Sequence, residues 1–85
     1  MADSGRITLT LYSRIWCHLC DDMLAGLQIL QARQSFELCI IDVDSQPALE
    51  QRLGDFVPVL MHCERELCYY HLNTAAVTDY LRDFR

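Results

Sequence analysis

Residues 11–20 have the sequence LYSRIWCHLC and lie where one hydrophobic pattern changes into another. Residues 7–12, which overlap the start of this segment, alternate apolar and polar side chains and are rich in β-branched residues. This pattern predicts a strand. After it, apolar residues recur at helical spacing, as Leu19, Met23, Leu27 and Leu30 show. A helix over residues 17–33 with one buried face explains that spacing. The segment therefore predicts a strand that leads into a helix, with a Cys-x-x-Cys motif at the junction.

Three further strands are predicted downstream, over residues 36–43, 57–61 and 67–72. In the first of these, the adjacent Ile40 and Ile41 indicate burial on both faces. The polar turn after the second strand predicts that the second and third form an antiparallel hairpin.

Residue types with strong positional preferences set the ends of these elements. Asp44 or Ser45 can cap a short helix that has Pro47 in its first turn and Gly54 just past its end. Pro58 is expected at the start of its strand, because a proline inside a ladder lacks a hydrogen-bond donor. These signals place a short helix between the second and third strands.

The chain ends in a last predicted helix, capped by Asn73 or Thr74. Its apolar stripe consists of Val77, Tyr80, Leu81 and Phe84. The predicted order is β-α-β-α-β-β-α, and the helical crossover makes the first two strands parallel. We therefore expect an α/β fold with a four-stranded mixed sheet flanked by helices on both faces, formed by residues 1–85 as a single domain.

The composition excludes several classes of function. The 85 residues are 52% hydrophobic and 22% charged, which is typical of a globular domain. The net charge of −5 disfavours binding to nucleic acid or to an anionic membrane. All seven basic residues are arginine, so mechanisms that need a lysine are excluded. No segment is long and apolar enough to predict a membrane span.

The cysteine content indicates a reducing compartment. Five cysteines are an odd number and too few for a disulfide scaffold. The polar residues 1–6 lack the pattern of a signal peptide. We expect a cytoplasmic monomer in which Cys39 is a small core residue and Cys63 and Cys68 flank the hairpin turn as reduced thiols.

The spacing Cys17-His-Leu-Cys20 at the start of a helix predicts disulfide exchange. The positive end of the helix lowers the pKa of the Cys17 thiol and so favours the nucleophilic thiolate. Two intervening residues place the second sulfur about one turn away. We expect Cys17 to be the exposed nucleophile and Cys20 the deeper, resolving thiol.

The whole chain resembles a glutaredoxin-like protein of the thioredoxin-fold superfamily, through residues 11–20 and through Val57-Pro58-Val59. The resemblance implies a thioredoxin-like fold and a dithiol oxidoreductase with catalytic Cys17 and Cys20. It implies that Val57 and Pro58 form a cis-proline element, which faces the cysteines and presents backbone to a bound thiol substrate. Arg14 stands where many glutaredoxins have a lysine that contacts glutathione, and Trp16 directly before the motif is thioredoxin-like. We expect both residues to contact the substrate, together with Val57 and Pro58.

The sequence also departs from the glutaredoxin pattern, and these departures concern glutathione. The segment between the cysteines is His-Leu, where a typical glutaredoxin has Pro-Tyr. Residues 71–75 replace the Gly-Gly and acidic residues that usually hold the γ-glutamyl end of glutathione. We expect no bound cofactor and weak binding of glutathione. The expected partners are a protein or small-molecule disulfide and an electron donor, either a reductase or glutathione.

Three other interpretations of the motif remain open at this stage. One is an adaptor module of the same fold whose cysteines have no redox function. The others are a structural zinc site that also uses Cys63 and Cys68, and an iron–sulfur cluster shared between two chains through Cys17. We expect no metal, because the two cysteine pairs lack the spacing of zinc knuckles.

Overall fold

The computed structural model describes residues 7–83. Its elements in chain order are β1 (Thr8–Ser13), α1 (His18–Gln31), β2 (Glu37–Asp42), the 3₁₀ turn η1 (Val43–Ser45), α2 (Pro47–Leu53), the 3₁₀ turn η2 (Gly54–Phe56), β3 (Val59–His62), β4 (Arg65–Tyr69) and α3 (Thr74–Asp83). This is the predicted β-α-β-α-β-β-α order. Phe84, the last residue of the predicted stripe, and residues 1–6 lie outside the described residues.

The four strands form one mixed sheet in the order β2-β1-β3-β4. β1 and β2 are parallel over their full length, from Thr8 opposite Glu37 to Ser13 opposite Asp42. β3 is antiparallel to β1 and to β4, with a register shift between Leu60 and Met61. The predicted parallel pair and the predicted hairpin are therefore both confirmed.

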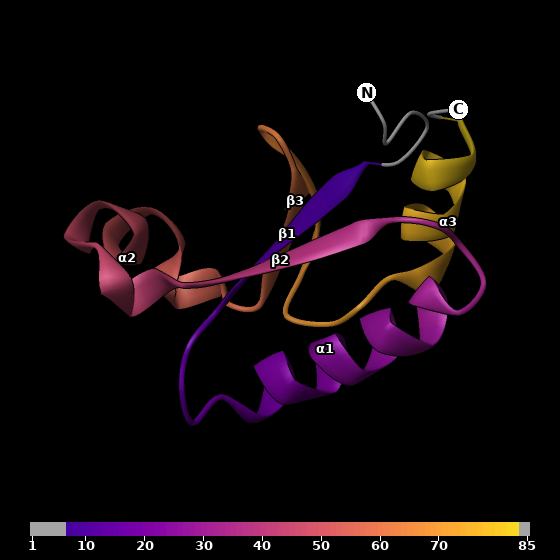
Figure 1. Cartoon of the computed structure of the whole chain (residues 1–85). Coiled ribbons are helices and arrows are strands. Elements are labelled where there is room, and N and C mark those ends of the chain that lie inside the picture. The colour runs from indigo at the N-terminus through magenta and orange to yellow at the C-terminus, as the bar shows by residue number, and fades with distance from the viewer. Residues whose placement is uncertain (1–6, 84–85) are drawn as a thin grey trace.

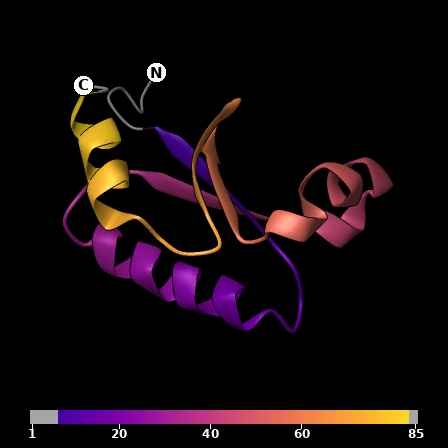
Figure 2. The ribbon, with the colours of Figure 1, turned by 180° about the vertical axis from the view of Figure 1, so that it is seen from behind.

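The hydrophobic core lies between α1, α3 and one face of the sheet (Figures 1 and 2). Alternation along β1 directs Leu9 and Leu11 into this layer, and α1 contributes the predicted face. The buried cluster consists of Leu9, Leu11, Met23, Leu27, Leu30, Phe36, Leu60, Val77 and Leu81. The helical and strand periodicities of the sequence thus identified most of the core.

The other face of the sheet has much less cover than the sequence predicts. α2 lies beyond the end of β2, and none of its residues is buried (Figure 1). β2 is an edge strand, and 52% of the Ile40 side chain is exposed. Cys39 is also exposed. The predicted two-sided burial of Ile40–Ile41 and the predicted core position of Cys39 are therefore wrong. Ile40 shares a face with Leu11 but lies at the edge of the sheet, whereas Cys39 is on the opposite, sparsely covered face.

Two predicted element ends also differ from the structure. Gln46 precedes α2 without a side-chain cap, whereas Asp42 accepts a hydrogen bond from the Asp44 amide at 2.9 Å and caps η1. β4 ends at Tyr69 and does not extend to residue 72, because Tyr70 has a φ of 65° and turns the chain out of the ladder. The additional η1 turn explains why neither Asp44 nor Ser45 caps the helix.

Three other end signals agree with the sequence. Pro47 is in the first turn of α2, and Pro58 lies directly before β3. At α3, the side chain of Asn73 accepts a hydrogen bond from the Ala76 amide at 3.0 Å. Within residues 7–83, no helix is long and apolar enough to cross a membrane.

Candidate active site

Cys17 and Cys20 form a disulfide at the start of α1. Cys17 is the N-cap residue, with extended backbone (φ −110°, ψ 105°), and its Sγ accepts a hydrogen bond from the Cys20 amide at 3.1 Å. The cap is possible because the first amides of a helix have no partner inside the helix. The same geometry therefore aligns the first sulfur with the positive end of α1.

The two sulfur-bearing residues differ in burial. Cys17 is half-buried, whereas Cys20 is 3% exposed and lies on the buried face of α1. The predicted difference in depth between the two residues is thus present in the structure. A reagent from solvent has better access to Cys17 than to Cys20.

The loop that precedes Cys17 presents two apolar side chains to solvent. Ile15 is 64% exposed and Trp16 is 98% exposed. Trp16 has a φ of 64°, in the left-handed region that bulky residues rarely adopt. Such strain often accompanies functional loops. Trp16 therefore has the exposure that the predicted substrate contact requires.

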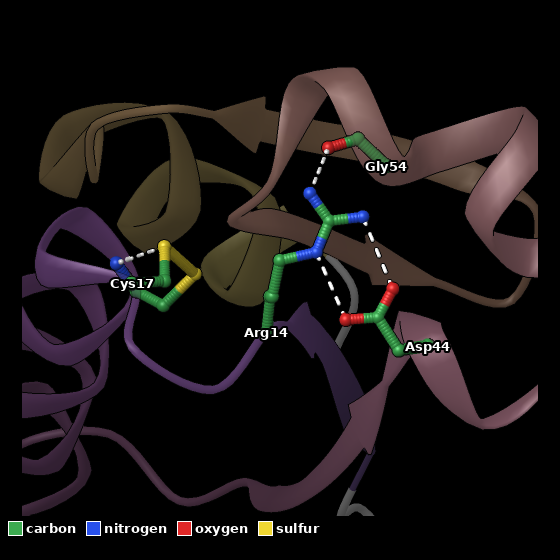
Figure 3. The surroundings of a disulfide bond; sticks show 5 residues. Arg14, Cys17, Asp44 and Gly54 are labelled. Carbon is green, nitrogen blue, oxygen red and sulfur yellow. Dashed lines mark hydrogen bonds and ion pairs between the residues drawn. A yellow bond between two sulfur atoms is a disulfide. The ribbon is translucent and has the colours of Figure 1, made fainter.

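Arg14 has polar partners within the protein (Figure 3). Its Nε and Nη2 donate to both carboxylate oxygens of Asp44 at 3.0 and 3.2 Å. Nη2 also donates to Glu50 at 3.2 Å, and Nη1 donates to the Gly54 carbonyl at 3.3 Å. The hydrogen bond with Asp44 and the charges of both carboxylates raise the pKa of Arg14 above its ordinary value. The guanidinium is therefore largely engaged within the protein, and its contact with a substrate stays a prediction.

Gly54 lies against the Arg14–Glu50 pair. A Cβ at residue 54 would lie 2.7 Å from Glu50 Oε2 and 2.9 Å from Arg14 Nη2. Both atoms are at the ends of flexible side chains, so a larger residue here would displace them from their present contacts. Arg14 consequently connects the loop before Cys17 with η2, the turn that leads to Val57 and Pro58.

The Val57–Pro58 peptide bond is cis, as the resemblance implies. Pro58 is buried and Val57 is half-buried. The Pro58 carbonyl accepts a hydrogen bond from the Tyr70 amide at 2.9 Å. The segment before β3 is thus held by the residue that follows β4.

Three exposed aromatic residues beside this segment were not singled out from the sequence. The Phe56 and Tyr69 rings are 5.8 Å apart and nearly perpendicular, and the Tyr69 and Tyr70 rings are 4.9 Å apart. They are 46%, 45% and 40% exposed in chain order. The signal in the sequence was weak: Phe56 directly precedes Val57-Pro58, and the two tyrosines are adjacent within the predicted strand 67–72. Their mutual packing appears only in the tertiary structure.

The remaining cysteines are free thiols. Cys63 is exposed at the hairpin turn, and Cys68 is half-buried in β4. Burial raises the pKa of the Cys68 thiol. Within the described part of the chain, no three His, Cys, Asp or Glu side chains gather where they could hold a metal ion.

Comparisons with known proteins add a family and a set of similar structures. The sequence profile of the glutaredoxin-like domain (DUF836) matches residues 8–82. The structure is similar to that of protein Ne2328 from Nitrosomonas europaea, with a TM-score of 0.78 and 39% identity over 87% of this chain and 89% of that chain. Protein XcR50 from X. campestris has a TM-score of 0.66 and 30% identity, over 88% of this chain and 96% of that chain.

A more distant similarity concerns the fold alone. Thioredoxin 1 from Thermosipho africanus has a TM-score of 0.62 and 21% identity, over 92% of this chain and 98% of that chain. A search of curated proteins found no match. Together with the strand order, these similarities show that the fold is thioredoxin-like, as the sequence predicts.

Proposed function

The chain belongs to the glutaredoxin-like domain family, and from this premise we propose that it is a thiol–disulfide oxidoreductase that uses Cys17 and Cys20. One observation carries the proposal. Cys17 caps α1, its Sγ accepts a hydrogen bond from the Cys20 amide, and it forms a disulfide with the buried Cys20. A structural disulfide needs no difference in access between its sulfurs. A catalytic pair does, because one sulfur must meet the substrate first.

The reaction proceeds by two exchanges between sulfur atoms. The Cys17 thiolate attacks a substrate disulfide, one substrate thiolate leaves, and a mixed disulfide with Cys17 forms. The Cys20 thiolate then attacks the Cys17 sulfur, the second substrate thiolate leaves, and the Cys17–Cys20 disulfide forms. Two electrons pass from the protein to the substrate. An external dithiol or two monothiols reduce the pair again.

The residues around the sulfurs have separate roles in this proposal. Trp16 and the backbone of Val57 contact the substrate, and Pro58 shapes the segment that presents that backbone. Arg14 holds the loop before Cys17 against η2 through its contacts with Asp44 and Gly54. The proposed setting is the cytoplasm, where the free thiols stay reduced.

Glutathione is a poor partner in this proposal. The Arg14 guanidinium is held by two carboxylates, which reduces its attraction for an anionic tripeptide. The net charge of −5 adds repulsion. The Gly-Gly and acidic residues that hold the γ-glutamyl end of glutathione in glutaredoxins are absent from this chain. Hydrogen bonds to charged groups are worth about 1.5–3 kcal/mol each, so the loss of two such contacts weakens the binding of glutathione by roughly a hundredfold or more. In a chemical-shift titration we expect no saturation at micromolar glutathione. Saturable micromolar binding centred on Arg14, Val57 and Asn73 would overturn this part of the proposal.

The main experiment compares three serine variants in a disulfide reduction assay. Cys17→Ser is expected to abolish turnover, because the other thiol at the start of α1, Cys20, is buried. Cys20→Ser is expected to accumulate the mixed disulfide at Cys17, which intact mass spectrometry detects. Cys63→Ser is the matched control, because it removes an exposed thiol outside the motif.

Each result has one interpretation. Loss of turnover in Cys17→Ser with full turnover in Cys63→Ser supports the proposal. Undiminished turnover in Cys17→Ser, or no turnover in the wild type with any disulfide, contradicts it and favours the adaptor interpretation. Stoichiometric zinc or a cluster chromophore in protein purified without chelator would instead favour a metal site.

A further inference from the structure

The exposed aromatic side chains of Phe56, Tyr69 and Tyr70 form one continuous group, which we call the aromatic platform. Phe56 contacts both tyrosines, with ring centroids 5.8 Å and 6.5 Å away, and the two tyrosines contact each other. Nearly half of each side chain remains accessible. A clustered set of exposed aromatic rings is characteristic of binding surfaces, because such rings bury a large area at a small entropic cost.

Hydrogen bonds from Tyr70 to the segment before β3 hold this residue of the platform in place. The Tyr70 hydroxyl donates to the Asp55 carbonyl at 3.0 Å, and the Tyr70 amide donates to the Pro58 carbonyl at 2.9 Å. Tyr70 keeps a φ of 65°, which costs free energy for a bulky residue. The two hydrogen bonds hold it there. A rigid surface of this kind binds without first having to become ordered.

The platform lies at the same end of the sheet as the disulfide. Across the sheet, Tyr12 at the end of β1 is opposite Val59, and Val59 is opposite Tyr69. Cys17 follows β1 after a short loop. Figure 1 shows the start of α1 below the turn that precedes β3 and the turn that follows β4. The same pairings put Tyr69 on the face opposite the Leu11–Leu60 core layer, so a polypeptide whose disulfide reaches Cys17 must pass the end of the sheet at Val57–Pro58 to contact the platform.

The charges near this end are mainly negative. Asp21 and Asp55 are exposed, and Arg14 is paired with two carboxylates. The surface therefore complements a partner that carries apolar and basic side chains.

We propose that the aromatic platform binds the segment beside the disulfide of a protein substrate, and that this segment is extended and carries apolar and basic side chains. This inference rests on the proposed oxidoreductase function and names its substrate class. It assigns Phe56 and Tyr69 as specificity-determining residues. Tyr70 holds the platform against the Pro58 segment.

The test uses two synthetic peptides, each with one cysteine in a mixed disulfide with thionitrobenzoate. Leucine and lysine flank the cysteine in one peptide, and glycine and glutamate flank it in the other. Attack by Cys17 on the peptide sulfur releases coloured thionitrobenzoate, and Cys20 then releases the peptide thiol. With the protein reduced beforehand, one turnover leaves the Cys17–Cys20 disulfide, so the second-order rate constant of thionitrobenzoate release is compared. We expect the wild-type rate constant to be roughly tenfold or more higher for the leucine–lysine peptide, as aromatic contacts at binding sites commonly provide.

Phe56→Ala and Tyr69→Ala are each expected to reduce this ratio by roughly fivefold, since each removes an aromatic contact. Neither residue belongs to the buried core, so two independent variants are available. Ile29→Ala is the matched control, because Ile29 is a 66% exposed apolar residue on α1. The ratio of the rates that this variant gives with the two peptides should equal the wild-type ratio.

The outcomes separate this inference from the proposed function. Equal second-order rate constants for the two peptides in the wild type, or an unchanged ratio in both aromatic variants, overturns the inference and leaves the oxidoreductase intact. No thionitrobenzoate release from either peptide overturns the proposed function itself.

Discussion

The position of Cys17 at the cap of α1 predicts a specific reactivity, which the Cys20→Ser variant isolates. Serine keeps the backbone amide that donates to Cys17 Sγ at 3.1 Å, and it leaves Cys17 without a disulfide partner. Cys39 and Cys63 are exposed free thiols in the same molecule and provide the internal reference. The variant therefore compares a capping thiol with two ordinary ones under identical conditions.

The magnitude follows from the two interactions that the thiolate receives. A hydrogen bond to a charged group contributes about 1.5–3 kcal/mol, and the end of an exposed helix contributes about 0.3–1 kcal/mol. The sum of roughly 2–4 kcal/mol raises the equilibrium ratio of thiolate to thiol by about 30- to 700-fold. Nucleophilicity falls as the pKa falls, with a Brønsted coefficient of about 0.4–0.5, so the rate advantage shrinks to roughly 5- to 50-fold. The exposed carboxylates of Asp21 and Asp22 favour the lower part of this range.

The assay is a brief exposure of the reduced variant to dipyridyl disulfide near pH 6, with an acid quench and peptide mass spectrometry. We expect modification chiefly at Cys17. A Cys17→Ser sample reports the background at the other thiols. Equal rates at Cys17, Cys39 and Cys63 would refute the reasoning, because the helix cap would then provide no stabilisation of the thiolate.

Three further predictions concern residues outside the motif. Burial raises the pKa of Cys68, so its thiolate forms only at higher pH and it should react more slowly than Cys63 with the same reagent; equal rates at pH 8 would contradict this. Leu27→Ala removes a fully buried side chain from the core and should lower the free energy of unfolding by about 2–5 kcal/mol in a urea titration; a loss below about 1 kcal/mol would mean that the core closes over the cavity. Arg14→Lys and Asp44→Asn should each shift unfolding to lower urea, and their double variant should be less destabilised than the sum of the two, whereas additive effects would indicate that the pair is not coupled.

The sequence identified those features that depend on short stretches of chain. The alternation along β1, the spacing of Met23 and Leu27 on α1, and the Asn73 cap each involve neighbours within a few residues. Local sterics and backbone hydrogen bonding determine such features wherever the segment is placed. The position of the cysteine pair at the start of a helix belongs to this class, and so the candidate chemistry could be predicted.

Features that depend on which elements become neighbours could be read only from the tertiary structure. Ile40 is an apolar, β-branched residue of the kind that is typical of buried strands. It is nevertheless exposed, because β2 lies at the edge of the sheet. The partners of Arg14 are 30, 36 and 40 residues away along the chain, so no local pattern marks the guanidinium as engaged. The strand order therefore decides the exposure of Ile40, and the path of η1 and α2 decides the partners of Arg14.

The sequence by itself thus determined the order of the elements, the apolar faces of α1 and β1 and the redox-type motif, because each arises from interactions between residues close together in the chain. Only the tertiary structure decided that the aromatic platform exists and that Arg14 is engaged. Tyr70 reaches Phe56 and Pro58 only after the hairpin has paired, and its left-handed backbone is held by hydrogen bonds to a segment more than ten residues earlier. Contacts of this kind close long loops, so they form only where the packed sheet has already brought the two segments together.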